Sequence, residues 1–305
     1  MVSADALQPP YQPNVAGVGG RPTVDVDIPA LSVFILLYLI GAIAHQIIFQ
    51  LNRRRGHKFL PSLFMFVFCM ARMVTCIMRL VWATRPTNVR IAIAAQIFTN
   101  LGILIVYVVV FILSQRLLRM THPRVGWSRA LSIADIIIYV FLGIAIVLVI
   151  AFTVLSFYTL DTKLLSAASW IQRAAITYLL LFNVITLVVW LYSLSPTGTI
   201  NISGTGSLMS KQAILGTAVV LLNLIAGFHA GTTWEPARPA SDPAWYDSRA
   251  AFYMLNFFCE IVVVYLLLIT RFDHRFWVPN GSTGPSDYSR GGKMDSSQEA
   301  DEGKV

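Results

Sequence analysis

Residues 59–84 read FLPSLFMFVFCMARMVTCIMRLVWAT, an almost unbroken apolar run that contains two arginines, Arg72 and Arg79. The run is longer than the roughly 20 residues that an α-helix needs to cross the ~30 Å hydrocarbon core of a bilayer. Its apolar residues are continuous rather than alternating, which favours a spanning helix over a strand of a β-barrel. Because a charge in hydrocarbon is costly and usually marks a working site, we expect both arginines to face protein rather than lipid.

Similar runs recur along the chain, which is 56% hydrophobic and only 12% charged. A soluble domain carries about twice that fraction of charged residues. The sequence therefore predicts an all-α fold, a polytopic membrane protein with a seven-helix transmembrane bundle. The expected spans are 28–51, 59–84, 91–115, 130–158, 165–194, 212–232 and 250–271.

Polar segments flank the expected transmembrane domain, which covers residues 28–280. Residues 1–27 are rich in Pro, Gly and polar residues and lack the basic start and apolar core of a cleaved signal peptide. We expect them to form a disordered extracellular tail. Residues 281–305 are also polar and are expected to form a disordered cytoplasmic tail.

The distribution of lysine and arginine predicts the orientation. Eleven of these residues lie in or beside the short loops on one side of the expected bundle and five on the other. Basic residues in short loops favour the cytoplasm, so we expect the N-terminus outside and the C-terminus inside. The eleven are Arg53, Arg54, Arg55, Lys58, Arg116, Arg119, Arg124, Arg129, Lys211, Arg271 and Arg275, and the five are Arg85, Arg90, Lys163, Arg238 and Arg249.

The second and seventh runs each carry a charge near mid-membrane. Arg72 lies thirteen residues after Phe59, about 20 Å from the inner surface, and Glu260 lies about 15 Å from the outer end of its run. Their depths match, so we predict an intramembrane pair. Tyr253 and Asn256 share helical spacing with Glu260 and are expected to supply further hydrogen bonds.

Other polar side chains in the spans predict a ligand pocket. Arg79 and Arg173 have no carboxylate at their depth within the expected spans, so the outer half of the bundle is expected to hold surplus positive charge. Such a pocket favours a carboxylate or phosphate group. The residues expected to line it are Arg79, Arg173, Gln96, Asn100, Asn223, His229, Tyr253 and Asn256. A purely structural role stays open, because Arg79 could snorkel and Arg72–Glu260 could simply join two helices.

Several function classes find no support. No lysine lies in an expected span, which argues against a retinal protein, and no HExxH, GxSxG or P-loop occurs in a suitable setting. We expect no enzyme activity, no metal and no cofactor. The net charge of +8 lies in short loops between apolar runs, so it does not indicate nucleic acid.

A basic surface is expected on the cytoplasmic side. Such a surface could bind an acidic signalling partner, or it could rest on anionic membrane lipid, with about 1 kcal/mol of attraction per charge. It could also serve only to determine the orientation of the chain in the membrane. The residues are Arg53, Arg54, Arg55, Lys58, Arg116, Arg119, Arg124 and Arg129.

Five stretches carry a family resemblance: RGHKF at 55–59, FCMARMVT at 68–75, AIAAQIFTN at 92–100, THPRVGW at 121–127 and FDHRFWVPN at 272–280. With these stretches the chain resembles filamentous-fungal seven-helix proteins labelled family C-like G-protein-coupled receptors, over roughly residues 28–280. More distantly it is similar in topology to the RTA-like lipid-translocating exporters of fungi.

The resemblance implies a receptor-like multi-pass protein of the plasma membrane or an endomembrane. Its leading expected function is to sense a small anionic or lipid-like ligand through a polar intramembrane pocket. Lipid export is the alternative, and a non-catalytic structural membrane protein is the third class.

Overall fold

The computed structural model describes residues 9–11, 15–196, 200–201, 203–236, 238–284 and 287–288. The parts of the two expected tails at 1–8, 12–14, 285–286 and 289–305 lie outside the described residues. The chain is 78% helical, and the described residues contain no strand. Seven spans long and apolar enough to cross a membrane confirm the predicted polytopic seven-helix bundle.

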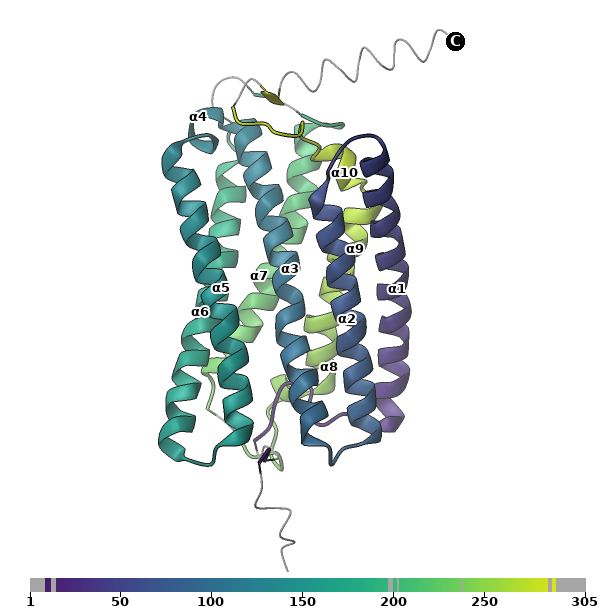
Figure 1. The fold of residues 1–305 in the computed structure, drawn as a ribbon, viewed down its shortest axis with the longest axis vertical. Helices are drawn as coiled ribbons and strands as arrows, with labels where there is room; N and C mark the ends of the chain where they lie inside the picture. The colour runs from purple at the N-terminus through teal and green to yellow at the C-terminus, as the bar shows by residue number, and fades with distance from the viewer. Residues whose placement is uncertain are drawn as a thin grey trace, which may run out of the picture.

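The helices follow the chain order drawn in Figure 1. The first six spans are α1 (Val24–Arg54), α2 (Leu60–Thr84), α3 (Val89–Thr121), α5 (Arg129–Tyr158), α6 (Thr162–Tyr192) and α7 (Leu208–Trp234). The seventh is composite: α8 (Arg249–Phe252), the π-helix η3 (Tyr253–Phe258) and α9 (Cys259–Ile269). Three short elements lie outside the spans: α4 (Pro123–Gly126), the 3₁₀ helix η2 (Trp245–Asp247) and α10 (Phe272–Arg275).

Polar side chains mark where many of these helices begin. Asn88, Ser128, Asp161, Ser207 and Ser248 each precede a helix, and each side chain accepts a hydrogen bond from a backbone N–H two or three residues later. Such N-caps satisfy N–H groups that have no partner inside the helix. The loops between apolar runs therefore specify the helix starts.

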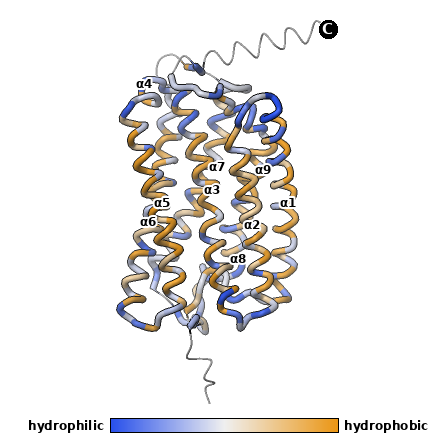
Figure 2. The backbone as a smooth tube through the Cα atoms, in the orientation of Figure 1, coloured by the Kyte–Doolittle hydropathy of each residue, from blue (hydrophilic) through white to orange (hydrophobic). Residues whose placement is uncertain are grey.

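Helix α3 occupies the centre of the bundle. It contacts α2, α5, α6 and α7, and 61% of its most apolar window is buried, against 22% for α5 and for α6. Helix α1 packs on α2 and α9, and α7 packs on α6 and α9. Hydrophobic residues dominate the middle of the helices in Figure 2, and hydrophilic residues gather toward the two ends.

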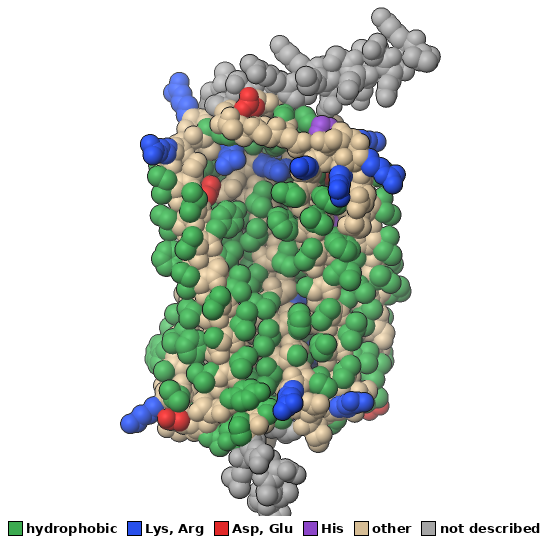
Figure 3. Space-filling view, in the orientation of Figure 1, with side chains coloured by type: hydrophobic (Ala, Val, Ile, Leu, Met, Phe, Trp, Pro, Cys, Tyr) green, Lys and Arg blue, Asp and Glu red, His purple; other side chains and the backbone are tan. Residues whose placement is uncertain are grey.

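The bundle has two distinct ends. The C-terminal end, uppermost in Figure 1, contains α4, α10 and the connection from α1 to α2. The N-terminal end contains the chain before α1, the α2–α3 and α5–α6 turns, and the connection from α7 to α8. Lys and Arg side chains lie along both ends in Figure 3, with a hydrophobic surface between them, as expected of a membrane-spanning bundle.

The ordered structure extends beyond the expected domain boundaries. Helix α1 begins at Val24 rather than at residue 28, and residues 15–23 pack across the N-terminal end. At the other boundary, Tyr288 is buried and its ring contacts Trp127 at a centroid distance of 5.4 Å. Two acidic residues in the first turn of α1 explain its early start, because they interact favourably with the helix dipole.

The expected basic surface is smaller than the sequence predicts. Arg116 donates from Nη1 to the Phe276 carbonyl at 2.8 Å, and Arg119 donates from Nε to the Gly126 carbonyl at 3.2 Å. Both guanidinium groups also lie over aromatic rings, so they hold the C-terminal end together. The exposed residues of that surface are Arg53, Arg54, Arg55, Lys58, Arg124 and Arg129.

Lys211 also differs from its expected place in a loop. It lies in the first turn of α7, is fully buried, and donates from Nζ to the Ser203 carbonyl at 2.5 Å.

Candidate functional site: a buried charge network and two cavities

Arg72 and Glu260 meet in the middle of the bundle. Arg72 on α2 donates from Nε to Glu260 Oε2 at 2.6 Å, and its Nη2 pairs with Oε1. Both side chains are completely buried. This two-pronged geometry is the strong form of an arginine–carboxylate interaction.

The hydrogen bonds that complete the pair come from two other helices. Arg72 Nη1 donates to the Thr99 carbonyl on α3 at 2.8 Å, and the Tyr38 hydroxyl on α1 donates to Glu260 Oε2 at 3.1 Å. Gly102 lets the guanidinium approach α3, since a Cβ there would lie 3.1 Å from it. The pair thus joins α1, α2, α3 and α9.

The expectation that Tyr253 and Asn256 would supply these bonds is wrong. The π-helix η3 intervenes, and its i→i+5 bonding pattern shifts the faces that 3.6-residue spacing predicts. Tyr253 instead donates to Asp27 Oδ1 at 2.5 Å. Asn256 is buried, and neither polar atom of its side chain hydrogen-bonds to a described residue.

A second charge cluster lies at the N-terminal end around Asp27. This carboxylate is fully buried, accepts the Thr23 backbone N–H at 2.8 Å, and lies 3.9 Å from Arg79 and 3.4 Å from Arg249. Arg79 therefore has a carboxylate partner that the sequence-based expectation lacked, although this one carboxylate faces two arginines. The sequence-based prediction missed this carboxylate because it placed residue 27 in the tail rather than in the first turn of α1.

Residues 15–23, which we call the N-terminal strap, bind this cluster. Arg79 Nη2 donates to the Gly19 carbonyl at 3.0 Å, and its guanidinium lies 4.0 Å from the centre of the Phe252 ring. Gly19 has a φ of +82°, and a Cβ there would lie 2.6 Å from the Phe252 ring. Only glycine suits both the backbone and the contact at this position.

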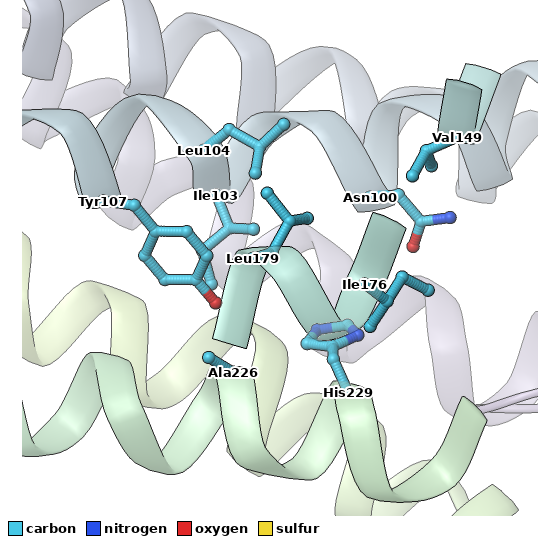
Figure 4. Close-up of a pocket in the computed structure, with 9 residues that line it drawn as sticks. All are labelled: Asn100, Ile103, Leu104, Tyr107, Val149, Ile176, Leu179, Ala226 and His229. Carbon is cyan, nitrogen blue, oxygen red and sulfur yellow. The ribbon is translucent and has the colours of Figure 1, made fainter. Parts of the chain in front are cut away.

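An interior cavity lies between α3, α5, α6 and α7. Its volume of about 30 Å³ has room for about two water molecules. Asn100 extends from α3 and His229 from α7 toward the same space in Figure 4, and Tyr107 lies at the opposite end of the cavity. The remaining lining residues are Ile103, Leu104, Val149, Ile176, Leu179 and Ala226.

A larger and more polar cavity, which we call the vestibule, opens at the N-terminal end. Its volume is about 220 Å³. Its walls come from α6, from the end of α7, from the connection to α8, and from Ala16 of the strap. The lining residues are Ala16, Ser169, Gln172, Arg173, Thr232, Thr233, Glu235, Pro236, Arg238, Tyr246 and Asp247.

The side chain of Arg173 is fixed in the vestibule wall. Its Nε donates to the Thr233 carbonyl at 3.2 Å. Its guanidinium carbon lies 5.2 Å from the Trp170 ring centre and 5.6 Å from that of Trp234. Cation–π contacts of this kind orient the guanidinium plane.

The strap and the connection to α8 are joined by backbone hydrogen bonds. Ala16 N donates to the Arg238 carbonyl at 2.8 Å, and Gly19 N donates to the Asp247 carbonyl at 3.0 Å. These bonds attach the vestibule wall to the strap that binds Arg79.

The residues of the predicted single pocket are thus separated. Arg173 lines the vestibule, Asn100 and His229 line the interior cavity, and Arg79 and Tyr253 belong to the Asp27 cluster. Gln96 is exposed on α3, and Asn223 joins α7 to α6 by donating to the Asn183 carbonyl at 3.1 Å.

Sequence reasoning missed Tyr38, Asp27, Glu235 and Asp247. Only Asp27 gave a usable signal, because an acidic residue near a helix start is typical of a first turn. Among the described residues, no group of three or more His, Cys, Asp or Glu side chains is placed to hold a metal ion.

Comparison with known proteins finds no match to a protein-family model, to a curated protein or to a solved structure. The chain's own geometry is that of a seven-helix membrane bundle with buried charge clusters and a polar vestibule at one end.

Proposed function

We propose that this chain is a receptor-like seven-helix membrane protein that senses a small or lipid-like ligand at the vestibule. One observation carries the proposal: the wall of the vestibule continues directly into the helix that holds the central ion pair. Tyr246 and Asp247 line the vestibule, and α8, η3 and α9 follow them along the chain. Glu260 lies at the start of α9.

The element between vestibule and ion pair is suited to a change of state. A π-helix is rare, and single π-turns inside α-helices occur frequently at functional sites. Here η3 contains Asn256, whose buried side chain makes no hydrogen bond to a described residue. A ligand that contacts Asp247 differently in two states of η3 would shift the population between them.

The charge distribution supports an orientation for this receptor. Exposed arginines and Lys58 at the C-terminal end favour a cytoplasmic location for that end. In the plasma membrane the vestibule then faces the outside of the cell, and the exposed basic residues face an acidic cytoplasmic partner or anionic lipid.

The experiment occupies the vestibule covalently, so it needs no knowledge of the natural ligand. Ser169 lines the cavity and is half-buried, whereas Ser166 on the same helix is exposed and does not line it. Ser169→Cys and Ser166→Cys are purified in lipid nanodiscs, and each is modified with a bulky methanethiosulfonate reagent. Hydrogen exchange is then followed by mass spectrometry.

The unsubstituted chain, treated identically, controls for the three buried native cysteines. Modification of Ser169→Cys is expected to change exchange in residues 253–260 and at the C-terminal end. Modification of Ser166→Cys is expected to leave both unchanged. Changes confined to residues around position 169 would contradict the receptor proposal.

A lipid-flux assay in reconstituted vesicles tests the alternative of lipid export. A receptor is expected to move a fluorescent phospholipid between leaflets no faster than protein-free vesicles do. Protein-dependent flux would replace the receptor proposal with export.

A further inference from the structure

The formal charges of the residues that line the vestibule sum to zero. Arg173 and Arg238 carry positive charge, and Glu235 and Asp247 carry negative charge. The wall therefore does not select an anion by net charge, contrary to the sequence-based expectation. A ligand that carries both signs fits it better, provided that one residue of each sign is available to it.

Arg173 supplies an available cationic group. Its Nε is bound to the Thr233 carbonyl, but its two terminal nitrogens have no hydrogen-bond partner among the described residues. No described carboxylate lies within 4.0 Å of it. The free edge of a fixed guanidinium matches the paired oxygens of a phosphate or carboxylate.

Asp247 supplies an available anionic group. It is only 8% exposed, and its Oδ2 accepts the Ala244 backbone N–H at 3.1 Å. Its Oδ1 makes no hydrogen bond to a described residue. Tyr246 lies next to it in the same wall, and an aromatic face beside a carboxylate suits an ammonium group.

The other two charges are less available or less buried. Arg238 lies 3.8 Å from Asp242, and both side chains are largely exposed, so this pair belongs to the rim. Glu235 is exposed as well. The inner wall thus holds one charge of each sign that makes no ion pair with a described residue, Arg173 and Asp247.

We infer that the vestibule binds a dipolar group, with a phosphate or carboxylate on Arg173 and an ammonium directed toward Asp247. The inference deepens the proposed function and depends on it only for the vestibule being the ligand site. Because Trp170 and Trp234 are 56% and 50% exposed beside Arg173, the cavity lies at the level of an interfacial aromatic belt. A zwitterionic lipid headgroup and a soluble zwitterion can therefore both present this chemistry.

Binding is measured on the full chain in maltoside micelles, which contain no phosphate. Phosphocholine, inorganic phosphate and choline are titrated separately, followed by intrinsic tryptophan fluorescence and calorimetry. In a second arm, the protein is placed in nanodiscs of phosphatidylcholine or of phosphatidylglycerol, and lipid retained after detergent extraction is identified by mass spectrometry.

Phosphocholine is expected to bind at least tenfold more tightly than phosphate or choline. Arg173→Gln and Asp247→Asn are each expected to weaken binding about tenfold or more, since each removes a charge-assisted contact. Arg85→Gln, an exposed arginine at the same end that does not line the vestibule, is expected to have no effect. Asp247→Asn keeps an oxygen that can accept the Ala244 N–H, and the thermal midpoint of each variant shows whether it is folded.

The two arms distinguish the source. Selective retention of phosphatidylcholine that Arg173→Gln abolishes, without tight phosphocholine binding, assigns the site to a lipid headgroup. Tight phosphocholine binding without retention assigns it to a soluble zwitterion. Equal binding of phosphate and phosphocholine without selective retention of phosphatidylcholine, equal loss with Arg85→Gln, or no binding in either arm would overturn the inference. The covalent occupation of position 169 would still test the receptor proposal separately.

Discussion

The Arg72–Glu260 pair provides the sharpest energetic prediction. Arg72→Met removes both bonds to Glu260 and the bond to the Thr99 carbonyl, and it leaves Glu260 buried with only the Tyr38 hydroxyl. Breaking a fully buried pair costs about 3–5 kcal/mol in soluble proteins. We expect a loss of that order in the free energy of unfolding for Arg72→Met and for Glu260→Gln.

The double variant separates a direct interaction from two independent losses. Independent losses would add to about 6–10 kcal/mol. Because neither partner is left alone in the double variant, we expect it to recover about 1–3 kcal/mol of that sum, as is usual for residues in contact. Denaturant unfolding in detergent micelles measures all four proteins, with Arg85→Met as the control for loss of an arginine. Strictly additive losses would refute the reasoning.

Three further predictions concern the two ends of the bundle. Asp27→Asn leaves Arg79 without its buried countercharge and is expected to cost about 3 kcal/mol of unfolding free energy in the same assay; an unchanged value would show that the cluster contributes nothing. Gly19→Ala is expected to cost about 2–4 kcal/mol of unfolding free energy, because the backbone φ is unfavourable for alanine and the added Cβ would lie 2.6 Å from Phe252. Gly20→Ala, with a φ of +56° and nothing within 4 Å of the added Cβ, should show only the backbone penalty. Equal losses for the two variants would contradict the predicted contact. At the C-terminal end, burial alone would raise the pKa of Asp273, but hydrogen bonds from Arg271 and Asn52 outweigh it and hold the pKa below 3.8. The stabilisation from this depressed pKa is present above pH 3.8 and is lost as the pH falls through the folded-state pKa. Asp273→Asn is therefore expected to lower the free energy of unfolding by about 1–2 kcal/mol near pH 7 and by less in acid. A loss of unfolding free energy that is independent of pH would contradict the assignment.

The sequence determines the spans well because burial in lipid leaves an unambiguous apolar pattern. Matching depth along two helices was also enough to pair Arg72 with Glu260. Depth does not specify rotation, however, and η3 breaks the 3.6-residue spacing from which the partners of the pair were predicted. Tyr38 could not be recognised for that reason.

The vestibule was beyond prediction for a different reason. Its walls combine α6, the end of α7, the connection to α8 and Ala16. Strap hydrogen bonds hold the connection, and Arg173 joins α6 to the end of α7, so no periodic pattern in the sequence indicates this arrangement. The position of Arg173 in a span makes it a candidate from the sequence, but Asp247, the acidic residue in the same wall, lies in a connection that hydropathy treats as a plain loop.

Accessibility of the vestibule from outside the cell tests the central claim most directly. Ser169→Cys and Ser282→Cys are expressed separately in cells, and each is treated with a membrane-impermeant maleimide before and after permeabilisation. Position 169 is expected to be labelled in intact cells, because it lines the vestibule at the N-terminal end. Position 282, at the C-terminal end, is expected to be labelled only after permeabilisation. Labelling of position 282 but not position 169 in intact cells, or of both, would contradict a membrane-spanning bundle whose vestibule opens outward.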